Sequence, residues 1–316
     1  MSAPFSLTPV EIPLPRGAFP GGGRAALRFG DRPICAFTRG RFRPCLHPVW
    51  TPAGHVVTAE QPADHPHHGG IWIAADHIGL LLQGPDGTER YDYCFYVDQV
   101  FQGRMPGQIR ESSLCLLTHT DHAALVRQDL DWVGPAEWGA EAGRAVVSER
   151  RWTAVTVSEA GHIFDITSEV TPAGDTPVAL GPTRHAWFNA RVADAIALDT
   201  ASRVTASGGT LGASAIQTRD TDWVDYSGPV GGGAMAGITV APVEPRQSAW
   251  FVADWGIMTV GQIRDEAIVL QPGERARFAC RMLAHDGPLS AGRDIWARVS
   301  FVAPDDMTST TTGGTE

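Results

Sequence analysis

Three imidazoles and one carboxylate stand together in the short stretch Asp64–His68. Imidazole transfers protons near neutral pH and is the most common metal ligand in proteins. Pro66 fixes its own φ and biases His65 towards an extended conformation, in which residues two apart point the same way. The spacing therefore predicts that His65 and His67 project into a shared cleft and carry the chemistry. It also predicts that His68 projects to the opposite face and supports packing.

Two chemical interpretations of this stretch stay open. In the first, the histidines act as general acid and base opposite a carboxylate, for which Glu149 is the candidate. In the second, His65 and His67 are paired ligands on a β-scaffold, and one divalent metal is the candidate cofactor. The third ligand would be a residue such as His47, His185 or Glu149, and nothing in the sequence decides between them. A structural role as an exposed turn rich in Pro, Gly, Asp and His is the remaining alternative.

Eight residues are candidates for the site as a whole. The candidate catalytic residues are His65, His67, Glu149 and His185. The candidate substrate-binding residues are His47, His68, Trp72 and Arg191. The indole of Trp72 could stack on a sugar face. Arg191 stands in an otherwise apolar segment, and its guanidinium fork suits a hydroxyl or a carboxylate, so we expect it to line the same cleft as the histidines.

The composition of the chain excludes several kinds of partner. The net charge is −10 and the 25 basic residues form no run, so a nucleic-acid partner is not expected. No apolar stretch approaches the roughly 18–20 residues that a membrane helix needs. The first 20 residues lack signal-peptide features, and the five cysteines are dispersed without a C-x-x-C pair. We therefore expect a cytoplasmic protein with reduced thiols and a small-molecule partner, whose oligomeric state the sequence does not indicate.

The elements that must position these residues are predicted to be β-strands. Apolar and polar residues alternate with a period near two from Tyr91 to His285, which is typical of half-buried strands. The clearest predicted strands are Ile109–Thr118, His122–Val133, Arg144–Val157 and His162–Thr171. With 35 glycines and few helical patterns, this predicts an all-β chain folded as a large antiparallel sandwich.

One domain is expected to contain nearly all of the chain. Residues 1–23 are predicted to form an N-terminal arm or a first edge strand, and residues 24–303 a single sandwich domain. A short helix is expected at Ser290–Val302, with Ser290 near its N-cap. The Ser-, Thr- and Gly-rich segment 304–316 is predicted to be a disordered tail.

Several motifs resemble the PmoA-like family, which is also described as the domain of unknown function DUF6807. The motifs are Leu46-His47-Pro48, Asp64-His65-Pro66-His67-His68, Glu149-Arg150-Arg151, Phe188 to Asp194, Asp222 to Pro229 and Ala284-His285-Asp286-Gly287. The resemblance implies a role in carbohydrate metabolism, and it leads us to expect a sandwich of the galactose-mutarotase-like supersandwich type. Arg184-His185 departs from the Lys-Glu of relatives, so the substrate is expected to differ.

Taken together, these features predict a carbohydrate-active enzyme. It would act on a sugar or an oxidised sugar derivative by His/carboxylate acid–base chemistry, as an epimerase, lyase or hydrolase. One alternative is a metal-dependent enzyme with the His65-x-His67 pair as ligands. The other is a non-catalytic carbohydrate-binding protein, although a binding face has less need of three imidazoles.

Overall fold

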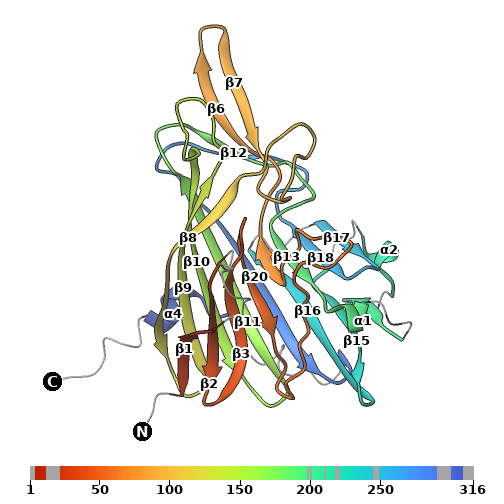
Figure 1. Cartoon of the computed structure of the whole chain (residues 1–316). Helices are drawn as coiled ribbons and strands as arrows, with labels where there is room; N and C mark the ends of the chain where they lie inside the picture. Colours follow the sequence, from red (N-terminus) through yellow and green to blue (C-terminus); the bar gives the residue numbers. More distant parts are fainter. Residues whose placement is uncertain are drawn as a thin grey trace, which may run out of the picture.

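A computed structural model describes residues 4–11, 22–197, 199, 201–209, 211–217, 221–244, 249–289 and 300–308. Two large antiparallel sheets lie face to face, and a smaller sheet extends from one end, where the β6–β7 hairpin projects (Figure 1). The prediction of a large antiparallel sandwich with only short helices is confirmed.

The first large sheet carries the candidate site. Its eight strands are ordered β1-β2-β3-β4-β5-β13-β18-β17. They are β1 Phe5–Pro9, β2 Arg24–Phe29, β3 Arg32–Arg39, β4 Pro44–Val49, β5 Ile71–Ile73, β13 Phe188–Arg191, β18 Ile257–Gly261 and β17 Ala249–Ala253. Antiparallel pairing of β5 with β13 sets Ala190 opposite Ile71, so Arg191 comes close to the histidine stretch across more than 100 residues of sequence.

The second large sheet consists of longer strands, ordered β14-β15-β16-β20-β11-β10-β9-β8. They are β14 Arg203–Ala206, β15 Val224–Gly231, β16 Ala234–Glu244, β20 Ala276–Asp286, β11 Gly161–Pro172, β10 Ala145–Val157, β9 Ala123–Val133 and β8 Gln108–His119. Strands β8 to β11 form consecutive antiparallel hairpins, and short turns fix the register of β8 with β9 and of β10 with β11.

The third sheet has the order β19-β12-β6-β7. Its strands are β19 Ile268–Leu270, β12 Val178–Leu180, β6 Ile78–Gly84 and β7 Gly87–Tyr93. The described helices are α1 Asp194–Ala197, α2 Ala213–Ile216 and α4 Pro304–Thr308. None of the helices in the described ranges has the length and apolar character needed to cross a membrane.

The main core lies between the two large sheets, because each strand turns alternate side chains inward. On β20, Phe278 and Cys280 face this core, while Arg281 faces outward and pairs with Asp165 at 2.6 Å. Trp187 stacks on Trp132 with a centroid distance of 5.2 Å and contacts Phe278 at 4.6 Å. Complete burial of a side chain such as Phe278 contributes about 1.5–3 kcal/mol.

The strand boundaries agree closely with the prediction, and the differences lie near the chain ends. All four of the clearest predicted strands are present as β8 to β11. Residues 5–9 of the predicted arm form an edge strand on β2. The predicted disordered tail begins with α4, where Met307 is buried against the second sheet. The predicted turn at His285 belongs to β20, and most of the predicted helix Ser290–Val302 lies outside the described residues.

Candidate functional site

The site is built on the outer face of the first large sheet. On β5, Ile71 and Ile73 turn into the main core, while Trp72 between them turns outward. On β13, Phe188 points inward in the same way, and Arg191 lies on the outer side. A second apolar cluster covers this outer face, so the polar groups here sit in a partly closed, low-dielectric environment.

The histidine turn, Asp64–His68, is not extended. The His65 amide donates to the carbonyl of Pro62 (3.1 Å), and the His68 amide donates to the carbonyl of His65 (3.0 Å). These i to i+3 bonds are those of consecutive β-turns. The extended geometry predicted for this stretch is therefore wrong, because the restriction that Pro66 imposes on His65 is also compatible with a turn.

Gly70 allows the histidine turn to approach the sheet, as the sequence suggests. Its φ is +58°, in the left-handed region that favours glycine. A Cβ at this position would lie 2.2 Å from the carbonyl oxygen of Leu46 and 2.8 Å from the Cβ of His47. The amide of Arg191 donates to the carbonyl of Gly70 (2.7 Å), which fastens the end of the turn to β13.

As a result of the turn, all three imidazoles gather on one side. The ring centroids of His65 and His68 lie 4.7 Å apart and are nearly parallel, at 11°. The centroid of His67 lies 4.5 Å from that of His68 and 5.7 Å from that of His65. His68 does not project to an opposite face, so the predicted division of the three rings between two faces is incorrect.

His68 is the buried member of the three. It is 2% exposed and packs against Trp72, at 4.9 Å between ring centroids, and against Trp255, at 5.6 Å. Burial and the neighbouring histidines lower the pKa of His68 to about 2, so the ring is neutral at pH 7. This environment makes His68 a packing residue, which agrees with the predicted packing role, and His68 also borders the pocket described below, so its role in substrate binding stays a prediction.

Asp64 and His65 form the first of two carboxylate–histidine dyads. His65 Nδ1 donates to Asp64 Oδ2 at 2.9 Å, and the ring stacks on Trp255 at 4.1 Å. Arg191 holds the same carboxylate with two bonds, from Nη2 to Oδ1 at 2.9 Å and from Nη1 to Oδ2 at 3.1 Å. The structure thus brings Arg191 to the histidine turn. Its guanidinium is 1% exposed, so it orients Asp64 and does not face a ligand.

Asp76 and His185 form the second dyad. His185 Nδ1 donates to Asp76 Oδ2 at 2.9 Å, and the hydroxyl of Thr183 donates to Oδ1. Burial alone would raise the pKa of Asp76, but these two hydrogen bonds outweigh it and lower the pKa, so the carboxylate is ionised. The His185 side chain is 18% exposed, and its Nε2 accepts only a long bond of 3.3 Å from Arg184.

Tyr96 connects the second dyad to the histidine turn. Its ring stacks on His185 at 4.9 Å and meets the edge of His67 at 5.6 Å. The pKa of His67 is lowered to about 4, first by burial and then by the charges of Arg43, His65 and His185. His67 is therefore neutral at pH 7 and stands between the two dyads as a hydrogen-bond acceptor or base.

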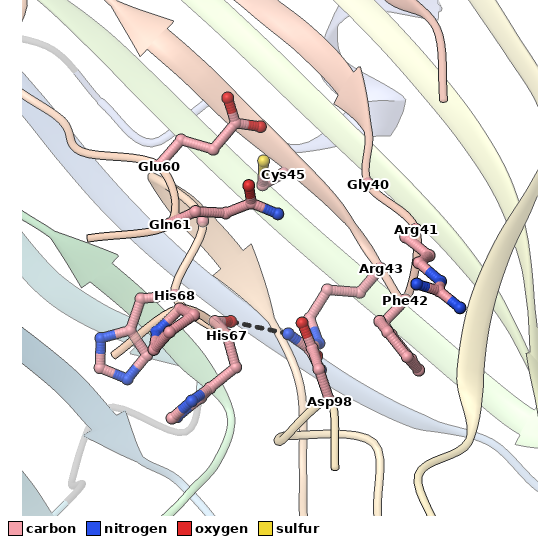
Figure 2. Close-up of a pocket in the computed structure, with 12 residues that line it drawn as sticks. Gly40, Arg41, Phe42, Arg43, Cys45, Glu60, Gln61, His67, His68 and Asp98 are labelled. Carbon is pink, nitrogen blue, oxygen red and sulfur yellow. Dashed lines mark hydrogen bonds and ion pairs between the residues drawn. The ribbon is translucent and has the colours of Figure 1, made fainter. Parts of the chain in front are cut away.

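A pocket of about 270 Å³ opens beside the histidine turn (Figure 2). Its lining includes Arg43, Cys45, Glu60, Gln61, His67 and Asp98. Figure 2 shows Glu60, Gln61 and Cys45 along one side, with Arg43 and Asp98 along the other. Arg43 donates to the carbonyls of Phe95 (3.0 Å) and His67 (2.7 Å) and to the carboxylate of Asp98. It thereby joins β4, the histidine turn and the loop that carries Tyr96.

Glu149 is separate from this site. It lies between the two sheets on β10, and its side chain is 0% exposed. Its carboxylate accepts hydrogen bonds from Arg151 (2.8 and 2.9 Å), Trp132 (2.9 Å) and Ser168 (2.7 Å). Because its oxygens are occupied and enclosed, Glu149 is a structural residue, and the expectation that it opposes the histidines as a catalytic carboxylate is corrected. The carboxylates that lie beside histidines of the site are those of Asp64 and Asp76.

The remaining candidates are also committed to other partners. His47 Nδ1 lies 3.0 Å from the hydroxyl of Thr58, and its Nε2 lies 4.0 Å from Glu60. Trp72 is 1% exposed and so cannot present its face to a sugar. Within the part of the chain that is described, no group of three His, Cys, Asp or Glu side chains is arranged to hold a metal ion. The expected grouping of His47 with His65 and His67 is not formed.

Several residues of the site were missed at the sequence level. Asp76, Tyr96 and Trp255 each supply a key contact, yet none stands in a recognisable motif. Arg43 precedes β4 and resembles an ordinary surface arginine in the sequence. Asp76 is a carboxylate three residues after the apolar strand Ile71–Ile73. That position, just beyond the end of a buried strand, is the one sequence signal that could have pointed to it.

The fold and the site define a β-sandwich protein with a histidine–carboxylate site on one outer sheet face. The chain belongs to the family of unknown function DUF6807, which it matches over residues 24–295. Comparison with curated proteins finds no match.

Among solved structures, a galactose mutarotase-like protein from Lactobacillus casei ATCC 334 is 9% identical, with a TM-score of 0.40 over 89% of this chain and 100% of that chain. A galactose mutarotase-like protein from Clostridium acetobutylicum is 9% identical, with a TM-score of 0.43 over 90% of this chain and 99% of that one. A putative kojibiose phosphorylase from human microbiome is 8% identical, with a TM-score of 0.36 over 87% of this chain and 33% of that chain.

Proposed function

We propose that this protein is a carbohydrate-active enzyme that acts on a sugar or an oxidised sugar derivative by histidine-based acid–base chemistry. The observation that carries the proposal is the pair of carboxylate–histidine dyads, Asp64–His65 and Asp76–His185, on either side of neutral His67. In each dyad the carboxylate accepts from Nδ1, so Nε2 is the atom left to exchange a proton with a ligand.

Opening, epimerising or eliminating across a sugar ring each needs one proton acceptor and one proton donor. His67 is held neutral and suits the acceptor role. The carboxylate of Asp76 holds His185 through Nδ1 and leaves Nε2 on the side away from that bond, so His185 suits the donor role. In the reverse direction these two residues exchange roles, and His65, which Asp64 holds through Nδ1, is a further proton-transfer group 5.7 Å from His67.

The surroundings of the dyads suit a sugar better than an apolar substrate. The half-buried rings of Trp255 and Phe251 provide apolar faces, and Phe251 lies 6.3 Å from the His185 ring. The neighbouring pocket adds the carboxylates of Glu60 and Asp98 and the amide of Gln61, which can accept hydrogen bonds from hydroxyl groups. Alternating apolar faces and hydrogen-bonding groups match the two kinds of surface on a pyranose. Methane, to which the PmoA-like name refers, offers no hydrogen bond to such groups.

The proposal is tested by following sugars in D₂O by NMR, which reports interconversion of anomers or epimers, elimination, and hydrogen exchange at carbon. The panel contains aldohexoses, their methyl glycosides and the corresponding keto sugars. His185→Asn, His65→Asn and His67→Asn should each lower turnover about 10²–10⁴-fold, the range for loss of a general acid or base. His122→Asn, an exposed histidine on the β8–β9 turn, is the matched control.

Turnover at the wild-type rate in both His65→Asn and His185→Asn would show that the dyads are not the catalytic groups. Binding of a sugar without turnover of any member of the panel would favour a non-catalytic carbohydrate-binding protein. Elemental analysis of untagged protein addresses the metal-dependent alternative. A stoichiometric transition metal whose removal abolishes turnover would assign the chemistry to that metal.

A further inference from the structure

The pocket next to the histidine turn contains hydrogen-bond acceptors that have no partner among the described residues. Glu60 lines the pocket, and its Oε2 accepts from Arg24 at 2.7 Å, while its Oε1 has no hydrogen-bond partner among the described residues. Asp98 also lines the pocket and accepts from Arg43 through Oδ1, and its Oδ2 likewise has no partner in the described part of the chain. Both carboxylates are 28% exposed, so a ligand in the pocket can reach them.

Gln61 adds an amide group to the same pocket. Its φ of +51° lies in the left-handed region, which is costly for a residue with a Cβ. Its backbone amide donates to the carbonyl of His68 (2.8 Å), and this bond holds the conformation. The side-chain amide itself makes no hydrogen bond within the described part of the chain. A strained backbone that presents an uncommitted donor and acceptor to a pocket is typical of a binding position.

The charge of the arginine inside the pocket is already paired. Arg43 is 6% exposed, it forms an ion pair with Asp98, and it also donates to the carbonyls of Phe95 and His67. An anionic ligand would therefore meet the carboxylates of Glu60 and Asp98 beside a cation whose charge Asp98 already balances. Hydroxyl groups, in contrast, donate to carboxylates readily.

We propose that this pocket binds one uncharged, hydroxyl-rich pyranose ring, with Glu60 and Asp98 accepting from its hydroxyls and Gln61 donating and accepting. The inference rests on the proposed function and names its substrate class. The volume of about 270 Å³ lies just below the roughly 300–1,000 Å³ of typical small-molecule sites, which fits one ring and not an oligosaccharide. His67, which lines the same pocket, faces the bound ring.

One cation at the rim provides the competing possibility. Arg41 is exposed, its guanidinium lies 5.4 Å from the centre of the Phe42 ring, and it forms no ion pair within the described residues. If the natural ligand were a uronate or a sugar phosphate, Arg41 is the residue that would bind its charge. The experiment must therefore compare neutral and anionic rings directly.

The test measures binding by calorimetry at pH 7 for two matched pairs of ligands. The pairs are methyl β-glucoside with methyl β-glucuronide, and methyl β-galactoside with methyl β-galacturonide. In at least one pair, the neutral member should bind at least about tenfold more tightly than its uronide, since an added carboxylate faces two carboxylates at close range. Gln61→Ala should weaken the neutral ligand about tenfold, and Glu60→Ala should weaken it at least as much.

Gln61→Ala is the decisive variant, because the Gln61 side chain has no hydrogen-bond partner among the described residues and the fold should be unaffected. Glu60→Ala releases Arg24, so its melting temperature is checked alongside. Glu89→Gln on β7 serves as the control and should leave binding unchanged. Tighter binding of a uronide, with loss of that binding in Arg41→Ala, would overturn the inference. Failure of all four ligands to bind would overturn it too.

Failure of this inference can be distinguished from failure of the proposed function. If a neutral glycoside binds and Gln61→Ala weakens it while no sugar is turned over, the pocket is a sugar subsite and the enzyme proposal fails. If a sugar is turned over with a KM that neither Gln61→Ala nor Glu60→Ala changes, the enzyme proposal stands and the pocket is not the subsite.

Discussion

Two aspartate–histidine pairs in this molecule have the same hydrogen-bond length and opposite surroundings. His285 on β20 pairs with Asp225 on β15 at 2.9 Å, and His185 pairs with Asp76 at 2.9 Å. The His285 side chain is 0% exposed, whereas the His185 side chain is 18% exposed. The two pairs consist of the same residue types. They differ in whether a ligand can reach the second ring nitrogen of the histidine, which is possible for His185 and not for His285.

The electrostatics of the buried pair support this division. Burial alone lowers the pKa of His285, but the bond to Asp225 and its charge outweigh burial and raise the pKa. The bond to Asp225 therefore favours the charged form of His285, and Thr239 also donates to Asp225 at 2.8 Å. Gly237 makes room for this pair, since a Cβ there would lie 2.8 Å from His285 Nε2. Such a pair contributes to folding and has no route to a substrate.

The largest expected effect is the difference in stability between His285→Ala and His185→Ala. His285→Ala leaves the Asp225 charge buried without its partner, which should cost about 3–5 kcal/mol of unfolding free energy. His185→Ala should cost about 1 kcal/mol, because water can reach the space beside Asp76. Urea denaturation of the two variants measures the difference.

Turnover should follow the opposite order. Folded His285→Ala, assayed at low temperature, should keep the wild-type rate, while His185→Ala should lose it. Equal losses of stability in the two variants would contradict the contrast between a buried and an open pair.

The second prediction compares the signs of the pH effects. The raised pKa of His285 means that its contribution to stability is present below its unfolded pKa, and is lost as the pH rises through its folded value. His68 behaves in the opposite way, since its pKa is lowered to about 2. As the pH falls below about 6.5, His68 becomes protonated in the unfolded state but stays neutral in the folded state. Stability then drops by about 1.4 kcal/mol per pH unit.

Urea unfolding of the wild type and of His68→Asn between pH 4.5 and 6.5 tests this sign. The variant should have the shallower dependence on pH, although His47, His67 and His162, whose pKa values are each lowered to about 4, keep part of the slope. An identical slope in both proteins would mean that His68 is not held neutral by burial.

The third prediction concerns Arg43, which connects the open site to the sheet. Arg43→Gln leaves a buried carbonyl of Phe95 and the carboxylate of Asp98 short of donors, which should cost about 1–3 kcal/mol. Removal of the positive charge should also raise the pKa of His67 from its value of about 4, because the Arg43 charge is one of the causes of its lowering. NMR titration of the His67 ring measures this directly, with Arg110→Gln as the control. An unchanged His67 titration would show that Arg43 acts on the fold alone.

The sandwich could be predicted from the sequence because its long strands carry their own signal. Burial alternates over much of β9, and short turns join β8 to β9 and β10 to β11, so local pattern and global structure agree there. The same pattern indicated correctly that Val147, Glu149 and Arg151 share a face. It could not reveal that this face is the interior, where Glu149 is enclosed by its partners.

The site was predictable only in part, because its geometry depends on a turn and on loops. The composition of Asp64–His68 is enough to identify it as a candidate site. The gathering of its three imidazole rings on one side, however, depends on two backbone hydrogen bonds of the turn. Tyr96 and Trp255 lie on loops about 30 and 190 residues from the histidine turn, and the tertiary fold brings them to His67 and His65. No local pattern encodes such contacts.

The smallest expected effect belongs to Asp64, the most open carboxylate of the two dyads. Burial alone would raise its pKa, but hydrogen bonds from His65 and Arg191 outweigh it and lower the pKa from 3.8 to about 2. Because the folded pKa is depressed, Asp64 contributes stability above pH 3.8 that is lost as the pH falls towards 2. The side chain is 41% exposed, so solvent screening limits this contribution to about 0–1 kcal/mol. Comparing wild type with Asp64→Asn by urea unfolding at pH 5 and pH 3 should show a gap that narrows at the lower pH. A difference of several kcal/mol in unfolding free energy at pH 5 would mean that Asp64 stabilises the fold as strongly as the buried Asp225–His285 pair. Exposure of the carboxylate would then not be what distinguishes the two kinds of pair.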